Sequence, residues 1–378
     1  MKKFLFLICL ALMPSVAFSA VAKKWTFIVY LNGDNNLDTF GDVNIKQMEK
    51  VGSTADVNVI VLRDRADQKV SAKIYYVNKG TLTTVKDFKK NLDMGDYHNM
   101  IELFRYAYTN YPAEHYVFDI WDHGGGWGKR LRTESFRDIS WDDGSGNHIT
   151  TPQIGLAMAE MVKINGGNKI DLVGTDACLM QMIEVGNEVA PYATAMVASE
   201  ETEPGDGWDY AVPLTLLAKN PDVTAIQLGD SIASGYVATG TSGLQQSVVQ
   251  TSDLATAKEK LSNLALLLMK FDVLTRDQVT AVINQTKGFA YSDFKDILDF
   301  TAHLTAATSD TTIKAAAKEV SDAVKVAIKG QHSNITGANG LSIWLPDSST
   351  YSSKKDRYAL LEWSSSTKWD DFLAAIYQ

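Results

Sequence analysis

The sequence predicts an α/β protein with a mostly parallel central sheet that helices cover on both faces. Short apolar runs alternate along the first half of the chain with segments of helical spacing, and these runs are apolar throughout. A strand that is apolar on both sides has to be buried on both, which is typical of parallel sheets between helices. The 378 residues, 45% of them hydrophobic, supply a core for one large domain or for one domain with an appendage.

The expected strands and helices follow one another in the first half of the chain. Strands are predicted at 25–31, 57–62, 72–77, 115–121, 170–174 and 195–198, and helices at 37–51, 97–110 and 179–190. A polar hairpin region follows residue 77, and another hairpin is expected in the second half of 129–150. Thr151 and Pro152 begin a further helix, because Thr caps helices and Pro is favoured in their first turn.

The second half of the chain has a different pattern. Residues 223–329 are mostly helical in spacing and rich in alanine, and residues 340–346 return as a strand. We therefore expect one α/β domain over 23–250 and a mainly helical C-terminal subdomain over 251–378, with a return strand near 340–345.

The first 22 residues have the pattern of a secretory signal peptide, with two lysines, an apolar run and then small residues. No later stretch reaches transmembrane length, so the expected product is secreted or periplasmic, with no membrane partner after signal removal. The formal charge of −9 and the lack of a basic stripe interleaved with aromatics argue against nucleic acid as a partner.

Two chemically active side chains follow predicted strands. Cys9 would leave with the signal peptide, so Cys178 has no cysteine with which to form an internal disulfide. Cys178 follows strand 170–174, and His123 follows strand 115–121. Ligands of open α/β sheets bind beyond the carboxyl ends of the strands, so we expect the thiol and the imidazole to meet there as a nucleophile and its proton carrier. A helix beginning at Leu179 would favour the thiolate by only about 0.3–1 kcal/mol, so His123 has to contribute.

The glycines after His123 suggest how an oxyanion would be held. Glycine lets backbone approach a ligand closely, and the N–H groups of Gly124 and Cys178 are candidates for an oxyanion hole. Simpler interpretations remain: glycines 124–126 as a tight turn, Cys178 as a buried small hydrophobe, and His123 as a structural residue.

Taken together, five blocks resemble the clostripain family of cysteine peptidases, relatives of caspases, legumains and gingipains. They are residues 25–37, His123-Gly124, Asp176-Ala177-Cys178, 199–208 and 338–346. The resemblance implies a three-layer caspase-like fold and a dyad of Cys178 as nucleophile and His123 as general acid/base. It also implies protein or peptide substrates that are cut after a basic P1 residue, the arginine or lysine before the cleaved bond.

The resemblance further implies which residues form the P1 pocket. Asp176 corresponds to a pocket acid, and Asp206 lies in the segment expected to form the opposite wall. Further candidates in that segment are Thr202, Glu203 and Trp208. Carboxylates suit a cationic side chain, and bidentate geometry favours arginine. A helix cap at Asp176, a turn residue at Asp206 and a core role for Trp208 are the alternatives.

Members of the family are often activated by a cut between the histidine and cysteine blocks. The interval here carries Arg130, Arg132 and Arg137, each a candidate P1 residue, and we favour Arg137 because it adjoins the predicted hairpin. The expected product is a monomer, nicked into two associated chains. An ordinary solvated loop is the alternative.

No cofactor is expected. Calcium is left open, since five aspartates offer oxygen ligands without EF-hand spacing: Asp34, Asp38, Asp142, Asp143 and Asp209. Two rival functions also stay open, a catalytically silent caspase-like binding protein and a structural protein with a redox-sensing thiol. Within the peptidase interpretation, caspases prefer aspartate and legumains asparagine at P1, whereas the acidic pocket candidates favour cations.

Overall fold

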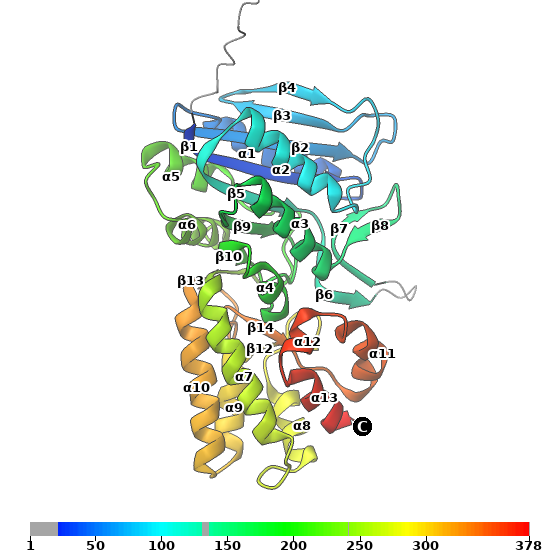
Figure 1. Ribbon diagram of the computed structural model, residues 1–378, viewed down its shortest axis with the longest axis vertical. Coiled ribbons are helices and arrows are strands. Elements are labelled where there is room, and N and C mark those ends of the chain that lie inside the picture. Colours follow the sequence, from blue (N-terminus) through cyan, green and yellow to red (C-terminus); the bar gives the residue numbers. More distant parts are fainter. Residues whose placement is uncertain (1–21, 131–135, 241, 378) are drawn as a thin grey trace, which may run out of the picture.

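The computed structural model describes residues 22–130, 136–240 and 242–377, and a nine-stranded sheet runs through its upper part (Figure 1). In sheet order the strands are β13 (Ile328–Ser333), β11 (Gln245–Gln250), β10 (Ala193–Ala198), β9 (Ile170–Asp176), β5 (Ala113–Trp121), β1 (Lys23–Gly33), β2 (Val57–Arg65), β3 (Lys73–Asn78) and β4 (Thr81–Asp87). The five strands from β10 to β2 are parallel, and the two at each end are antiparallel. The predicted mostly parallel α/β fold is therefore confirmed.

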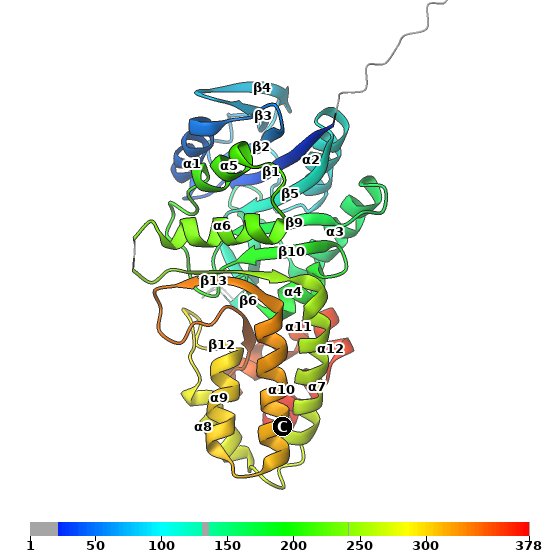
Figure 2. The same ribbon diagram turned by 90° about the vertical axis from the view of Figure 1, so that its left-hand side faces the viewer.

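Helices cover both faces of the sheet (Figure 2). One face carries α1 (Asp38–Val51), α5 (Ala211–Lys219) and α6 (Ala225–Val237), and the other carries α2 (His98–Asn110), α3 (Thr151–Ile164) and α4 (Ile183–Val189). Successive side chains of β1 enter opposite layers: Phe27 and Val29 pack into the first core, Ile28 and Tyr30 into the second. The strand is apolar throughout because both of its sides are buried.

Two strands of the sheet were not predicted. β11 and β13 lie in the stretch whose spacing looked mostly helical, and they extend the sheet beyond β10 in antiparallel pairs. β11 reads Gln-Gln-Ser-Val-Val-Gln, and β13 is a half-buried edge strand that contains lysine, glycine and histidine. Neither has the continuous apolar run of a central parallel strand, so a search for such runs misses both.

The C-terminal part lies below the sheet in Figure 1 and is mainly helical. Its helices are α7 (Leu254–Leu268), α8 (Arg276–Gln285), α9 (Ile297–Ala307), α10 (Thr311–Ala327), α11 (Ser348–Tyr358), α12 (Glu362–Ser366) and α13 (Trp369–Tyr377). The return strand is β14 (Ser342–Trp344), which pairs with β12 (Phe294–Asp296) and stays outside the central sheet. The domain boundary at residue 250 stays a prediction, and β13 beyond it belongs to the central sheet.

A small third sheet lies beside the carboxyl ends of the central strands. It contains β6 (Gly124–Arg130), β7 (Phe136–Asp142) and β8 (Asn147–Ile149), of which β7 and β8 are the predicted hairpin. Helix α3 begins next, at Thr151 and Pro152 as predicted. Its cap is Thr150, which forms a capping box with Gln153, and Thr151 is the first helical residue instead of the cap. Residues 1–21 of the predicted signal peptide, which spans 1–22, lie outside the described part. Among the described residues no helix combines the length and hydropathy needed to cross a membrane.

Candidate active site

A narrow pocket opens beyond the carboxyl ends of β5 and β9, with a volume of about 360 Å³ including its mouth. The two strand ends are joined by a 3.2 Å hydrogen bond from the Asp122 N–H to the Asp176 carbonyl. The pocket is lined by Leu37, Trp121, Asp122, His123, Asp176, Ala177, Cys178, Glu203, Pro204, Gly205 and Gly207. Four of the predicted site residues, His123, Cys178, Asp176 and Glu203, therefore share one pocket.

The half-buried thiol of Cys178 lies against the segment that follows β10. Its Sγ accepts a hydrogen bond from the backbone N–H of Glu203 at 3.2 Å, and the carbonyl oxygen of Glu203 is 3.8 Å away. The backbone of Glu203 therefore offers the sulfur both a donor and an acceptor, and these two contacts fix the position of the thiol in the pocket.

The helix that we expected at Leu179 is not there, and this prediction is wrong. Helix α4 begins at Ile183, and Leu179 has a φ of 65°. The Leu179 N–H donates to the Glu201 carbonyl at 3.1 Å, and the Gln181 N–H to the Ser199 carbonyl at 2.8 Å. The backbone N–H groups of Leu179 and Gln181 therefore donate to the 199–201 segment and not to carbonyls of a helix. No helix N-terminus therefore adjoins the sulfur, and the Glu203 N–H stands beside it instead.

The imidazole of His123 is held from two directions. Its Nε2 lies 2.8 Å from the side-chain oxygen of Asn36, and its ring stacks on Trp141 with centroids 4.7 Å apart and planes 24° apart. The preceding residue, Asp122, accepts hydrogen bonds from the amides of Asn32 and Asn35 and from the Trp141 N–H. Burial holds the pKa of the Asp122 carboxyl well above its usual range. The loop after β1 and strand β7 thus both fix the strand end that carries His123.

Gly124 explains how closely the two strand ends approach. A Cβ at this position would lie 2.2 Å from the carbonyl oxygen of Cys178 and 3.0 Å from its backbone nitrogen. Only glycine fits without moving one of the strands. The backbone of Gly124 and that of Cys178 are therefore in contact, which the proposed oxyanion hole requires.

Asp176 forms the floor of the pocket and is only 4% exposed. The Trp208 N–H donates to both of its oxygens at 3.2 Å, and the hydroxyl of Tyr210 lies 3.0 Å from Oδ2. Tyr210 also lies 2.6 Å from Asp119, a second buried acid, whose other oxygen accepts the Asp176 N–H. Burial raises the pKa of both carboxyls, and the charge of Asp176 raises that of Asp119 further.

Glu203 adds a further carboxyl to the same pocket. Both of its carboxyl oxygens are buried, and its side chain shares a hydrogen bond with the carboxyl of Asp176. Burial raises the pKa of Glu203 well above its usual range, and the charges of Asp176 and Cys178 add to the effect. Among the described residues that line the pocket there is no lysine or arginine. A group of buried carboxyls without a counterion suits a cationic ligand.

The other pocket candidates lie outside this lining. Thr202 is exposed and borders a neighbouring hollow, and Asp206 is exposed, with its carbonyl accepting the Asn44 amide at 2.8 Å. Trp208 is buried under the floor, where a Cβ on Gly174 would come within 2.7 Å of its ring.

Of the candidate cleavage residues, Arg130 ends β6 and Arg137 lies in β7. Their backbones are at neighbouring positions of the β6–β7 pair, where Arg130 faces Phe136 and Lys129 faces Arg137. Arg132 lies outside the described residues. In the described ranges no three His, Cys, Asp or Glu side chains are grouped so as to hold a metal ion.

Two site residues escaped the sequence analysis, Asn36 and Trp141. Both contact His123 from segments that are distant in the sequence. The run Asn32–Asn36 lies between the predicted strand 25–31 and the predicted helix 37–51, and its three asparagines after a buried strand were the one available signal.

The fold and this pocket define a caspase-like α/β protein with a cysteine and a histidine in one cleft, the class of the caspase-related cysteine peptidases. The model of the clostripain family matches residues 29–375, so the chain belongs to that family of cysteine endopeptidases. Clostripain from Hathewaya histolytica is 28% identical over 219 residues, which are 50% of this chain and 41% of that protein. The chain thus matches about two fifths of the length of this relative.

Solved structures agree on the fold. A secreted C11 cysteine protease from Bacteroides thetaiotaomicron in complex with an irreversible peptide inhibitor superposes with a TM-score of 0.70 at 20% identity, over 92% of this chain and 99% of that one. An inactive zymogen C11 protease from Parabacteroides distasonis reaches 0.71 at 16% identity, over 92% and 98%. The predicted caspase-like fold is therefore confirmed.

Proposed function

We propose that this chain is a secreted cysteine endopeptidase that cleaves peptide bonds after arginine or lysine, with Cys178 as nucleophile and His123 as general acid/base. One observation carries the proposal. The pocket that holds the sulfur and the imidazole is also lined by three acidic residues, Asp122, Asp176 and Glu203, and among the described residues that line it His123 alone can carry a positive charge.

The reaction follows from this arrangement. The Cys178 thiolate attacks the scissile carbonyl carbon, and the oxyanion that forms accepts hydrogen bonds from the N–H groups of Gly124 and Cys178. The imidazolium of His123 gives its proton to the leaving amine as the C–N bond breaks, which leaves a thioester. Neutral His123 then takes a proton from water, whose oxygen attacks the thioester, and returns it to the departing sulfur.

The preference for a basic P1 residue rests on the charge of the pocket. Asp176 already accepts bonds from Trp208 and Tyr210, and the buried carboxyl of Glu203 is held beside it by a side-chain hydrogen bond. A guanidinium or ammonium group would supply charged donors to both carboxyls and neutralise the floor. Arginine, with its planar fork, can bind two oxygens at once.

Export and self-processing complete the proposal. The signal pattern over residues 1–22 supports a secreted or periplasmic enzyme, and the basic residues of the 129–150 loop support self-cleavage, first after Arg137. The product would be a monomer of two associated chains that needs no cofactor. On a denaturing gel the active protein should show two fragments, and Cys178→Ala should show one full-length band. If the active protein also stays full length, self-cleavage is contradicted.

A set of peptides that differ only at P1 tests the specificity. We expect turnover with arginine and lysine, none with aspartate or asparagine, and none by Cys178→Ala. Preference for aspartate or asparagine would overturn the pocket assignment. If neither peptides nor an Arg-directed covalent probe react, the chain is instead the catalytically silent binding protein.

A further inference from the structure

We propose that Asn36 is a positioning residue for His123, which keeps the imidazole proton on Nε2 and so presents Nδ1 as the reacting nitrogen. The inference rests on the proposed function, because it assigns a partner to the general acid/base of that reaction. Asn36 had no role of its own in the sequence analysis, although the loop after β1 lies in the block 25–37 and contains Asp34, a candidate calcium ligand.

The contact itself determines the tautomer. The side-chain oxygen of Asn36 lies 2.8 Å from Nε2 of His123, and an amide oxygen can only accept a hydrogen bond. Nε2 therefore carries the hydrogen, and in the neutral ring the proton acceptor is Nδ1. The stacked indole of Trp141 covers one face of the ring and opposes rotation away from Asn36.

Both partners of this contact are tied to the same buried carboxyl. Asp122, directly before His123, accepts from the amides of Asn32 and Asn35, which both precede Asn36 in the loop after β1. The side-chain oxygen of Asn35 in turn accepts the Leu37 N–H at 2.8 Å. A shift of the loop relative to the strand end would break these buried bonds, so the two groups keep a fixed separation.

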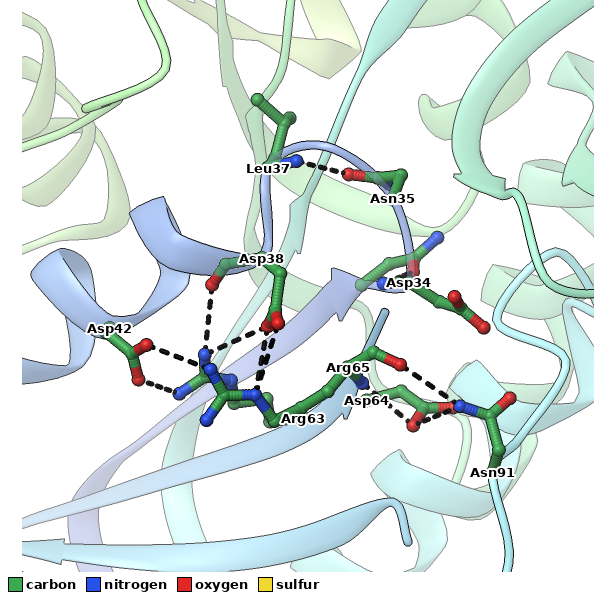
Figure 3. Close-up of polar contacts among 10 residues, drawn as sticks. Asp34, Asn35, Leu37, Asp38, Asp42, Arg63, Asp64, Arg65 and Asn91 are labelled. Atoms are coloured by element: carbon green, nitrogen blue, oxygen red, sulfur yellow. Dashed lines mark hydrogen bonds and ion pairs between the residues drawn. The ribbon is translucent and has the colours of Figure 1, made fainter. Parts of the chain in front are cut away.

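The far end of the loop is anchored as well (Figure 3). Asp38 and Asp42, in the first turns of α1, form ion pairs with Arg63 and Arg65 of β2. Arg63 is 6% exposed, and its guanidinium also donates to the Asp38 carbonyl at 3.0 Å. This network ties the start of α1 to the sheet, so the loop is held at both of its ends.

Asn36 differs from its neighbours in being exposed, whereas Asn32 and Asn35 are buried. Replacing it removes no buried bond, so a variant should fold normally. The functional effect has an upper limit, because general acid/base catalysis as a whole contributes about 10²–10⁴ in rate. Loss of orientation alone should lower kcat by roughly 10- to 100-fold.

Three variants of the full chain test the proposal. Asn36→Ala removes the acceptor, and Asn36→Asp keeps an oxygen at the same place and adds charge. Gln68→Ala is the matched control, because it removes a 2.6 Å bond to Asp34 in the same loop without touching His123. We expect Asn36→Ala to lower kcat 10- to 100-fold with KM and Tm unchanged, and Gln68→Ala to keep kcat within about threefold.

The pH profile separates orientation from general loosening. The other titratable groups of the pocket are Asp122, Asp176, Cys178 and Glu203, with Asp143 acting on Asp122, and all variants share them. The carboxylate of Asn36→Asp favours the imidazolium, so its kcat should recover toward wild type while the histidine limb of the profile moves to higher pH. An Asn36→Ala enzyme with wild-type kcat and profile would overturn the proposal.

A spectroscopic measurement separates this failure from failure of the proposed function. In ¹⁵N-histidine-labelled Cys178→Ala protein, His123 should be the Nε2–H tautomer, and Asn36→Ala should give a mixture. An Nδ1–H tautomer in the starting protein would contradict the inference even if the enzyme cleaves after arginine. Conversely, an Nε2–H tautomer that depends on Asn36, in a chain that cleaves no basic substrate, refutes only the function.

Discussion

Glu184 of α4 is buried where the sheet meets the C-terminal part, and it makes stability depend on pH. Its Oε1 accepts the Trp344 N–H of β14 at 2.8 Å and the Tyr358 hydroxyl of α11 at 3.0 Å. Its Oε2 is buried with no partner among the described residues. Burial raises the pKa of Glu184 from 4.5 to about 7. The folded protein therefore holds this side chain as a neutral acid at pH values where the unfolded chain ionises it.

The sign and the size follow from linkage. A raised pKa in the folded state means that the stabilisation is fully present below pH 4.5 and is lost as pH rises to about 7. The span of about 2.5 pH units, at about 1.4 kcal/mol each, makes about 3 kcal/mol. Glu184→Gln keeps the acceptor oxygen and cannot ionise, so its unfolding free energy should lack this loss.

Urea unfolding between pH 4.5 and 8 measures the effect, in a Cys178→Ala background that prevents self-digestion. The free energy of unfolding of the parent should fall relative to that of Glu184→Gln by about 3 kcal/mol across this range. Glu102→Gln, which removes a largely exposed carboxylate of α2, controls for the loss of one surface charge. Parallel curves for the parent and Glu184→Gln would refute the reasoning.

Three further predictions concern single contacts. Lys354→Met should lower the free energy of unfolding by about 3–5 kcal/mol, because it leaves Asp293 buried without its 2.7 Å ion-pair partner. Adding Asp293→Asn to the same chain should restore part of the lost stability. An unchanged urea midpoint for Lys354→Met would contradict this prediction. Gly124→Ala should slow labelling of Cys178 by an Arg-directed probe about 100-fold, since the added Cβ would collide with the Cys178 carbonyl. The near-ultraviolet circular dichroism spectrum should stay native. Labelling at the wild-type rate would speak against the collision. Trp141→Leu should lower kcat by about 10-fold through loss of the stacked ring, whereas Trp141→Phe should keep most of the wild-type kcat. Equal kcat values for the two variants would exclude a role for stacking.

The order of the central strands and helices was predictable because it follows from the local pattern of apolar and polar residues. Strands β1, β2, β5 and β9 are mostly apolar on both sides, with single polar residues such as Asp119 in β5, and such runs indicate burial on both faces. Motif spacing likewise placed a histidine and a cysteine after two of these strands. The parallel topology then brings the two strand ends to the same edge of the sheet.

Predictions failed where distant segments compete for backbone hydrogen bonds. Residues 179–182 have helical spacing, but the 199–201 segment takes the N–H groups of Leu179 and Gln181, so the helix starts later. β11 and β13 join the sheet despite polar sequences, because backbone hydrogen bonds with distant strands decide their pairing: β11 lies between β10 and β13, and β13 is the edge strand.

The sequence by itself determined the class of fold, the family and the pair of reactive side chains, since each of these depends on residue identity and short-range spacing. Only the tertiary structure decided which groups surround that pair. Asn36 meets His123 across 87 residues of chain, and the buried carboxyls of Asp119, Asp176 and Glu203 gather from three segments. Such neighbours depend on how the strands and loops pack. Contacts between residues that are distant in the sequence produce no periodic pattern that a single sequence could reveal.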